Sequence, residues 1–386
     1  MRSVYLDNAA TTQIAPEVLD DMVRFERDGR GNPHRGLHAF AGRATIVLEA
    51  ARTRVSSFIG GSDELIFTKS TTEGLNLAIM NLTRGLGAGD EVVLTIFDHH
   101  ATLLPLYEAS KRQGFVLRTI GSAQRPTPAA IVDDARAIIG PRTKLVVFPH
   151  VSNVLGTVLP AKELVEIAKS VGAKVLIDGA QAVGHMNVDV GEIGCDAYAF
   201  SAHKMYGPMG IGALYVKRDV LKGWSPMMYG GGMIEEVERV KSKEESNDIK
   251  VRYLTGPRLF EAGTPNVTGA FGFMAACHYV DGIGRTKIQK EESELARYLI
   301  DRLSESPSIT IHPSRGSIVS FSVRNMHPHD VAQGLSDHGV MVRAGNHCAA
   351  PLAQSLDPAG TVRVSVGVTT TRADIDYLID ALKEYV

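Results

Sequence analysis

The sequence predicts an α/β protein whose central, mainly parallel sheet is covered by helices on both faces. Between residues 63 and 217, short apolar strands alternate with amphipathic helices, an order typical of parallel strands joined by crossover helices. The strands are nearly continuous apolar runs, such as KLVVFP at 144–149, as expected of a sheet buried on both faces. With 386 residues, the chain is long enough for two domains.

The elements of the large domain follow one another regularly. Strands are predicted at 63–70, 90–97, 115–121, 144–149, 174–179, 196–203 and 212–216. Helices are predicted between them, at 71–84, 101–114, 128–139 and 161–172. Ligands of such folds bind beyond the C-terminal ends of the strands, so we expect functional residues in the loops that follow strands.

A second group of elements follows a charged interruption at 233–259, which is poor in core residues and is expected to be an exposed excursion. The later elements read helix, helix, strand, helix, strand, strand and helix, over 269–283, 289–306, 317–323, 327–339, 341–345, 362–368 and the last residues. Thr371 and Asp374 fit a capping box that begins the closing helix. We therefore predict a large α/β domain over 15–265 and a smaller α+β domain from 1–14 and 266–386.

The composition is that of an ordinary globular protein, with 44% hydrophobic and 22% charged residues. The formal net charge of −2 gives no reason to expect nucleic acid or an acidic membrane as a partner. No apolar run reaches the roughly 18 residues of a membrane span, and the N-terminal MRSVYLDNAATT lacks an apolar signal core. Three cysteines argue against a disulfide framework, so we expect a cytoplasmic protein.

Lys204 lies in SAHKMYGP between two predicted strands, and Asp178 ends the strand before them. A strand-end lysine is usually a solvated surface residue, and a strand-end aspartate is usually a turn residue or a helix cap. On neighbouring loops, the two residues also fit pyridoxal phosphate. A lysine amine forms a Schiff base with the aldehyde of this cofactor, and a carboxylate keeps its ring nitrogen protonated.

A phosphate site is predicted in KSTTEGLNL, residues 69–77, where a strand runs into a hydroxyl-rich turn that opens a helix. Ser70 and Glu73 fit a capping box. The first-turn amides and the hydroxyls of Thr71 and Thr72 can bind a phosphate at the positive end of the helix. A plain helix cap explains the same residues, so this motif supports a phosphate site only in combination with Lys204.

His99 and His100 follow another predicted strand. Adjacent side chains of an extended chain point to opposite faces, so this pair is poorly placed to bind a metal together. One imidazole stacked on an aromatic ring at the sheet edge fits better, and a core or capping histidine is the plain alternative.

Cys348 lies in a short loop, VRAGNHCAAPLAQ, whereas the other two cysteines lie in or beside apolar segments and are expected in the core. Arg343 and His347 are close in sequence, and cationic neighbours lower the pKa of a thiol. Because the loop is short, we expect its thiol to be partly sheltered. Arg363 begins a later strand and can bind a substrate carboxylate in bidentate fashion.

These segments together resemble a known family. SAHKMYGPMGIGALY, VLIDGAQAVGH, HVSNVLGT, FEAGTPN and RAGNHCAAP are similar to motifs of cysteine desulfurases of the NifS/SufS kind, which are class V, fold-type I pyridoxal phosphate enzymes. The resemblance extends from Asp7 to the last helix. The short cysteine loop, together with HVSNVLGT and AGNHCA, favours the SufS-like branch, group II.

The resemblance implies a role for each candidate residue in the cofactor site. Lys204 would be the Schiff-base lysine, Asp178 would pair with the ring nitrogen, and His99 would stack on the ring. Gln181 would hydrogen-bond the ring hydroxyl oxygen. The residues implied to bind phosphate are Thr71, Thr72, Ser201 and His203.

The resemblance also implies a substrate and partners. Asn153 and Arg363 would hold the carboxylate of L-cysteine, and Cys348 would take its sulfur as a persulfide, leaving alanine. The persulfide sulfur would pass to an acceptor protein for iron–sulfur cluster assembly. Thr264 would reach the phosphate held by the other subunit, so the resemblance implies a homodimer.

The sequence departs from the family pattern at Asn346, where the family often has a second histidine, and in the length and charge of the excursion. Other readings are a selenocysteine lyase, an aminotransferase, a kynureninase-like hydrolase and a non-catalytic scaffold. A transaminase needs no thiol at Cys348, whereas a selenocysteine lyase also places a cysteine there and stays open. Lys204 and Asp178 argue against a scaffold.

Overall fold

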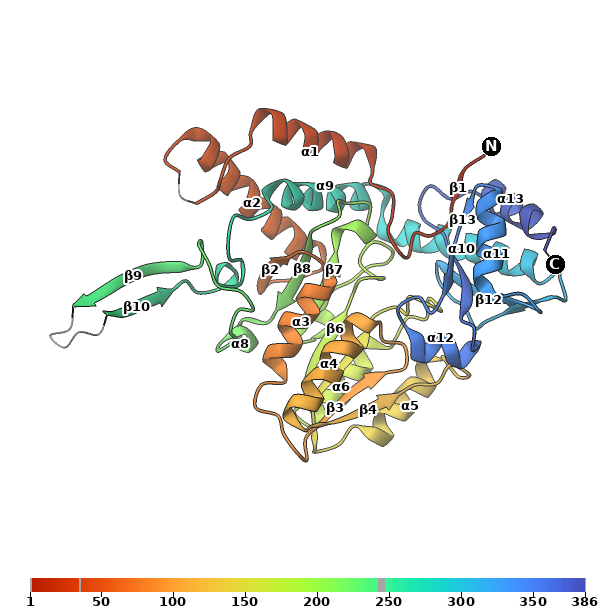
Figure 1. Ribbon diagram of the computed structural model, residues 1–386, viewed down its shortest axis with the longest axis horizontal. Helices are drawn as coiled ribbons and strands as arrows, with labels where there is room; N and C mark the ends of the chain where they lie inside the picture. Colours follow the sequence, from red (N-terminus) through yellow and green to blue (C-terminus); the bar gives the residue numbers. More distant parts are fainter. Residues whose placement is uncertain (1, 35, 242–246, 386) are drawn as a thin grey trace.

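A seven-stranded sheet in the order β2-β8-β7-β6-β5-β3-β4 lies at the centre of the computed structural model, which describes residues 2–34, 36–241 and 247–385 (Figure 1). Its strands are β2 (Glu64–Thr68), β3 (Glu91–Thr95), β4 (Val116–Ile120), β5 (Thr143–Pro149), β6 (Lys174–Asp178), β7 (Ala197–Ser201) and β8 (Gly212–Val216). Strands β3 to β7 pair in parallel, and β8 lies antiparallel between β7 and β2. The predicted mainly parallel sheet is confirmed.

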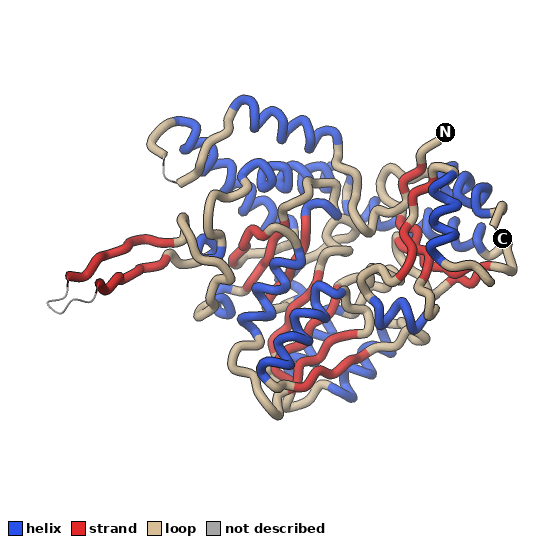
Figure 2. The backbone as a smooth tube through the Cα atoms, in the orientation of Figure 1, coloured by secondary structure: helices blue, strands red, loops and turns tan. Residues whose placement is uncertain are grey.

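Helices cover both faces of this sheet, because successive side chains of a strand point to opposite sides (Figure 2). On one face, Val92 and Leu94 of β3 pack against α3 (Thr71–Leu82) and α4 (His100–Gln113). On the other face, Val93 belongs to a core shared with other helices. These are α1 (Pro16–Asp28), α2 (Ala39–Phe58), α5 (Pro128–Ile138), α6 (Ala161–Ser170), the one-turn α7 (Val190–Ile193) and α9 (Val267–Ile283).

A smaller sheet has a core of its own, and both chain termini lie beside it (Figure 1). Its antiparallel strands are, in spatial order, β11 (Ile309–Ile311), β12 (Ile318–Val323), β15 (Thr361–Ser365) and β14 (Arg343–Gly345). Helices α10 (Arg285–Leu303), α11 (Pro328–Asp337) and α13 (Arg372–Leu382) pack on it, and β1 (Val4–Tyr5) pairs with β13 (Val340–Met341) beside it. The capping box predicted for the closing helix forms between Thr371 and Asp374.

The packed cores depart from the predicted division at two helices. Helix α9 falls within the range 266–386 predicted for the smaller domain, yet its buried residues belong to the core of the large sheet. Helix α12 (Ala350–Leu356) also falls within that range, and its Leu352 is fully buried in the core of the large sheet. The Cys348 loop therefore joins a strand of the smaller sheet to a helix that packs on the larger one.

The charged excursion at 233–259 contains a β-hairpin that extends away from the body of the protein (Figure 1). Strand β9 (Ile234–Lys241) pairs antiparallel with β10 (Asn247–Tyr253), and residues 242–246 of the predicted excursion lie outside the described residues. Arg252 forms ion pairs with Glu235 and Glu236. Composition predicted the exposure but not the strands, because a solvent-facing ribbon lacks the apolar runs of a buried strand.

The remaining short elements are α8 (Arg218–Leu221) and two 3₁₀ turns, η1 (Ala202–Lys204) and η2 (Pro257–Phe260). None of the helices in the described ranges combines the length and the apolarity that crossing a membrane requires.

Candidate active site

One cavity lies where the loops after the parallel strands meet, at the carboxyl edge of the large sheet. Strands β2, β3, β5, β6 and β7 all end at this edge, so residues far apart in sequence come together there. The predicted site residues that line the cavity are Thr71, Thr72, His99, Asn153, Asp178, Gln181, Ser201, His203 and Lys204.

Lys204, in the turn after β7, and Asp178, at the end of the neighbouring β6, both line this cavity, as predicted. Burial lowers the pKa of the Lys204 amine, while the nearby Asp178 raises it. Burial raises the pKa of the Asp178 carboxyl, while a hydrogen bond from the Ala180 N–H at 2.9 Å and the charge of Lys204 lower it. The amine and the carboxyl thus share one cavity, and the charge of each favours the charged form of the other, against the effect of burial.

The turn that carries Lys204 is held by the N-terminal segment, which sequence reasoning did not single out. Thr12 donates its N–H to the His203 carbonyl at 2.9 Å and accepts the Tyr206 N–H on its hydroxyl at 2.7 Å. Tyr206 has a left-handed backbone with φ of 66°, which is unfavourable for a bulky residue and needs such support. A threonine in an N-terminal loop gives no sequence signal of this role.

The predicted phosphate site lies at the N-terminus of α3. Ser201 joins this helix to β7, because its hydroxyl accepts the Thr71 N–H at 2.6 Å and contacts the Thr71 hydroxyl at 2.6 Å. The capping box predicted here forms only in part: Ser70 accepts the Glu73 N–H, but the Glu73 carboxylate accepts the N–H of Lys69. Amides and hydroxyls at a helix N-terminus suit a bound anion.

Two histidines of the cavity are neutral. His99 caps α4, and its Nδ1 accepts the Ala101 N–H at 3.0 Å, so the ring carries its proton on Nε2. Burial and the charge of Lys204 lower the pKa of His99 to about 3. Burial and the charge of Lys204 lower the pKa of His203 to about 4, and its Nδ1 lies 3.2 Å from the hydroxyl of Thr11.

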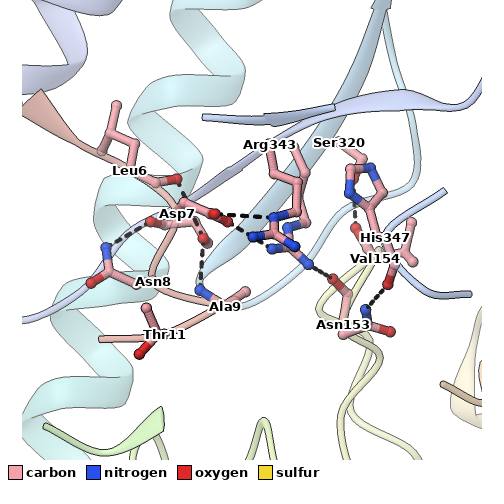
Figure 3. Close-up of polar contacts among 12 residues, drawn as sticks. Leu6, Asp7, Asn8, Ala9, Thr11, Asn153, Val154, Ser320, Arg343 and His347 are labelled. Atoms are coloured by element: carbon pink, nitrogen blue, oxygen red, sulfur yellow. Dashed lines mark hydrogen bonds and ion pairs between the residues drawn. The ribbon is translucent and has the colours of Figure 1, made fainter. Parts of the chain in front are cut away.

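Arg363 and Asn153, predicted to bind a carboxylate, lie in contact. Nη1 of Arg363 donates to the Asn153 carbonyl at 2.8 Å, and Nη2 pairs with Asp7 at 2.8 Å. Asp7 also accepts a bond from Arg343 at 3.0 Å (Figure 3). Among the described residues, Nε of Arg363 and Oδ1 of Asn153 are buried without a hydrogen-bond partner. Asp7 was not predicted as a site residue, although it starts the matching segment.

Cys348 follows β14, and the structure corrects two expectations about it. The thiol is exposed rather than sheltered, so a short loop does not hide it. His347 is not a cation, because burial and the charge of Arg363 lower its pKa to about 3 and its Nε2 pairs with the Thr361 hydroxyl at 2.9 Å.

The remaining candidates lie elsewhere. Cys195 and Cys277 are fully buried, as predicted. Thr264 does not line the cavity of Lys204; it lines a separate pocket together with Phe67 and Glu261. Its predicted role in a partner subunit stays a prediction. No group of three or more His, Cys, Asp and Glu side chains is arranged to hold a metal ion anywhere in the described part of the chain.

Comparisons with known proteins agree across nearly the whole chain. The family model for aminotransferase class-V matches residues 4–378. A probable cysteine desulfurase of Halalkalibacterium halodurans is 42% identical over 99% of this chain and 93% of its own length. A cysteine desulfurase of Haloferax volcanii is 41% identical, over 98% of this chain and 88% of its own.

Solved structures lead to the same group. An apo structure of a cysteine desulfurase from Thermococcus onnurineus NA1 has a TM-score of 0.92 at 36% identity, covering 100% of this chain and 94% of that one. The cysteine desulfurase CsdA from Escherichia coli, in an S-sulfonic acid form, has a TM-score of 0.87 at 32% identity, covering 99% and 94% of the two chains.

The buried histidines predict a pH dependence of stability. His150, directly after β5, contacts the Tyr198 hydroxyl through Nδ1 at 2.9 Å, and burial lowers its pKa to about 4. The unfolded chain takes up this proton near pH 6.5, so the stability contributed by neutral His150 is lost as the pH falls below that value. When the pH falls from 7 to 5, we expect the free energy of unfolding of wild type to decrease by about 2 kcal/mol more than that of His150→Gln.

Urea unfolding at both pH values measures this difference. His278→Gln, at an exposed position of α9, is the control, and its free energy of unfolding should decrease as much as that of wild type. An equal loss in wild type and His150→Gln would contradict a buried neutral imidazole.

Proposed function

We propose a function for this chain from one premise: it belongs to the aminotransferase class-V family. The chain is a cysteine desulfurase, which converts L-cysteine to L-alanine and transfers the sulfur to an enzyme cysteine. The observation that carries this function is that the exposed Cys348 lies in a loop bound to the cavity, where Asn153 donates to the carbonyl of the preceding residue, His347, at 2.7 Å. A transaminase needs no thiol at this place, and the relatives that match nearly the whole chain are named as cysteine desulfurases.

The side chains of the cavity fit pyridoxal 5′-phosphate. Lys204 offers a buried amine to an aldehyde, Asp178 a buried carboxyl to a ring nitrogen, and His99 a neutral imidazole to a ring face. Gln181 lines the same cavity, and its Nε2 donates to the Ala9 carbonyl at 2.7 Å. The phosphate would be held at the start of α3 by Thr71, Thr72, Ser201 and His203. When bound, this cofactor supplies an electron sink for negative charge on the substrate.

The chain's own residues can then bind the substrate and move its proton. Nε of Arg363 and Oδ1 of Asn153 are both buried without a hydrogen-bond partner among the described residues, so a substrate carboxylate and ammonium group would satisfy them. Burial lowers the pKa of Lys204, which favours its neutral amine. A neutral amine at that position can accept the proton of the substrate's α-carbon at Nζ.

Sulfur transfer is assigned to Cys348. Its thiolate attacks the sulfur of L-cysteine, so that an S–S bond forms as the bond between sulfur and the β-carbon breaks. The electron pair of the broken bond stays on the β-carbon, where a proton completes the methyl group of alanine. The Cys348 side chain is left as a persulfide, and its exposure gives an acceptor protein access to the terminal sulfur.

We further propose that the acceptor serves iron–sulfur cluster assembly and that the protein works in the cytoplasm. The decisive experiment incubates purified protein with L-cysteine and a reductant, and assays alanine and sulfide, with selenocysteine as a parallel substrate. A selenocysteine lyase is the second candidate function, since enzymes of that kind also have a cysteine near the position that Cys348 occupies in this chain. Strong preference for selenocysteine would establish it.

The first prediction of this function concerns Lys204. We expect the purified protein to be yellow, and borohydride reduction to fix the cofactor on this lysine, because its buried amine faces the cavity. Peptide mapping after reduction locates the label. A label on another lysine, or the absence of bound cofactor, would overturn the proposed site.

The second prediction separates cofactor binding from sulfur transfer. Cys348→Ser keeps the size of the side chain, but its hydroxyl stays protonated without a base and is a poor nucleophile. The variant should keep the yellow colour and its spectral response to L-cysteine, yet form no persulfide and lose most alanine production. Cys195→Ala and Cys277→Ala are the controls: both cysteines are buried and should be dispensable for turnover. Wild-type alanine production by Cys348→Ser would refute the assignment.

The third prediction concerns assembly. Thr264 is exposed, does not line the cavity of its own chain and lies in the FEAGTPN segment that the family resemblance places in a partner's site. We expect a homodimer in which each cavity is completed by the other chain. Sedimentation at working concentration measures this, and a fully active monomer would contradict it.

A further inference from the structure

The backbone around Cys348 is strained and is held by residues outside its own loop. His347 and Cys348 have φ angles of 50° and 54°, two consecutive left-handed residues, neither of which is glycine. This conformation is unfavourable for residues with a Cβ atom and persists only where surrounding contacts impose it. Contacts to these two residues therefore decide where the Cys348 thiol lies.

Thr361 of the smaller sheet contacts the His347 ring, and two residues of the large domain bond to the backbone carbonyls of the turn. The His347 carbonyl accepts a bond from Nδ2 of Asn153 at 2.7 Å (Figure 3). The next carbonyl, that of Cys348, accepts the His100 N–H at 2.6 Å. Nε2 of His100 then accepts the Ala350 N–H at 3.1 Å, so His100 bonds to the chain on both sides of Ala349. Asn153 lines the cavity, but His100 does not.

The position of His100 connects the cavity to the nucleophile loop. His100 is the first residue of α4, and His99, which caps this helix, lines the cavity. The same turn therefore presents one imidazole to the cavity and uses the other to hold the loop. Cys348 comes between β14 of the smaller sheet and α12, so a bond from α4 fixes this loop relative to the large sheet.

We propose that His100 is a positioning residue, whose two hydrogen bonds hold the Cys348 loop in its left-handed turn and keep the thiol within reach of the substrate sulfur. The role requires a neutral imidazole with its proton on Nδ1, because Nε2 is an acceptor. This proposal rests on the proposed function, since the place of the thiol matters only if it receives sulfur.

A graded set of variants separates the two bonds. His100→Ala removes the side-chain acceptor and keeps the backbone donor, whereas His100→Gln places another acceptor at a similar distance from the backbone. His100→Pro removes both bonds. Proline is tolerated at the first position of a helix, and His99, with φ of −70° and ψ of 154°, already has the conformation that a residue before proline adopts. His278→Ala, at an exposed position of α9, is the matched histidine control.

Hydrogen exchange of the segment 346–352 is the first readout and needs no catalysis. We expect exchange in His100→Ala to be about tenfold faster than in wild type, because one hydrogen bond of ordinary strength is lost. His100→Pro should exchange faster still, and His100→Gln and His278→Ala should resemble wild type. Unchanged exchange in both the Ala and the Pro variant would overturn the anchoring role.

Turnover is the second readout. The kcat for alanine formation should fall about tenfold in His100→Ala and recover in His100→Gln, with KM and the yellow colour retained in both. If His100→Ala exchanged faster but kept the wild-type kcat, the positioning role of His100 would be overturned. An equal loss of yellow colour and activity would also overturn it, because that result indicates misfolding. If wild type itself made no alanine from L-cysteine, the proposed function would fail, while the exchange series would still decide the anchor.

Discussion

Parallel pairing of β3, β5, β6 and β7 is the constraint on which the site depends. Parallel strands all end at one edge of the sheet, so the loops after them meet without any further device. Asp178 and Lys204 become neighbours because β6 pairs with β7, and Asn153 joins them because β5 pairs with β6. A change of strand order would leave each residue at a strand end but separate the amine from the carboxyl.

Charge within the site is concentrated on a few groups. Burial keeps His99, His203 and His347 neutral, since each has a pKa lowered to between about 3 and about 4. Arg363 then remains a cation for an anionic ligand, while burial favours the neutral amine of Lys204. Arg363 is almost fully buried and pairs with Asp7, whose carboxylate offsets the cost of keeping the guanidinium away from water. Its Nε still lacks a partner, which leaves one donor for a substrate.

Residues outside the Lys204 segment and outside the Cys348 loop hold these two reactive residues in place. Thr12 fixes the turn that carries Lys204, and Asp7 fixes Arg363, so the N-terminal segment supports both the cofactor end and the substrate end of the site. His100 and Asn153 fix the Cys348 loop from the large domain in the same way. The reactive side chains are thereby placed by packing and hydrogen bonds, and Cys348, unlike the buried Cys195 and Cys277, is exposed.

The sequence by itself determined the alternation of strands and helices and the Thr371 capping box, because each follows from a local pattern of a few residues. It also pointed to nine residues that line the cavity, among them Lys204 and Asp178, through short motifs and the family resemblance that these motifs carry. Only the tertiary structure decided that Asp7 pairs with Arg363, 356 residues away, and that His100 bonds to Ala350, 250 residues away. It also decided that His347 is buried and neutral and that Cys348 is exposed. The local sequence carries no signal for these features, because burial and hydrogen-bond partners depend on which distant segments the fold brings alongside.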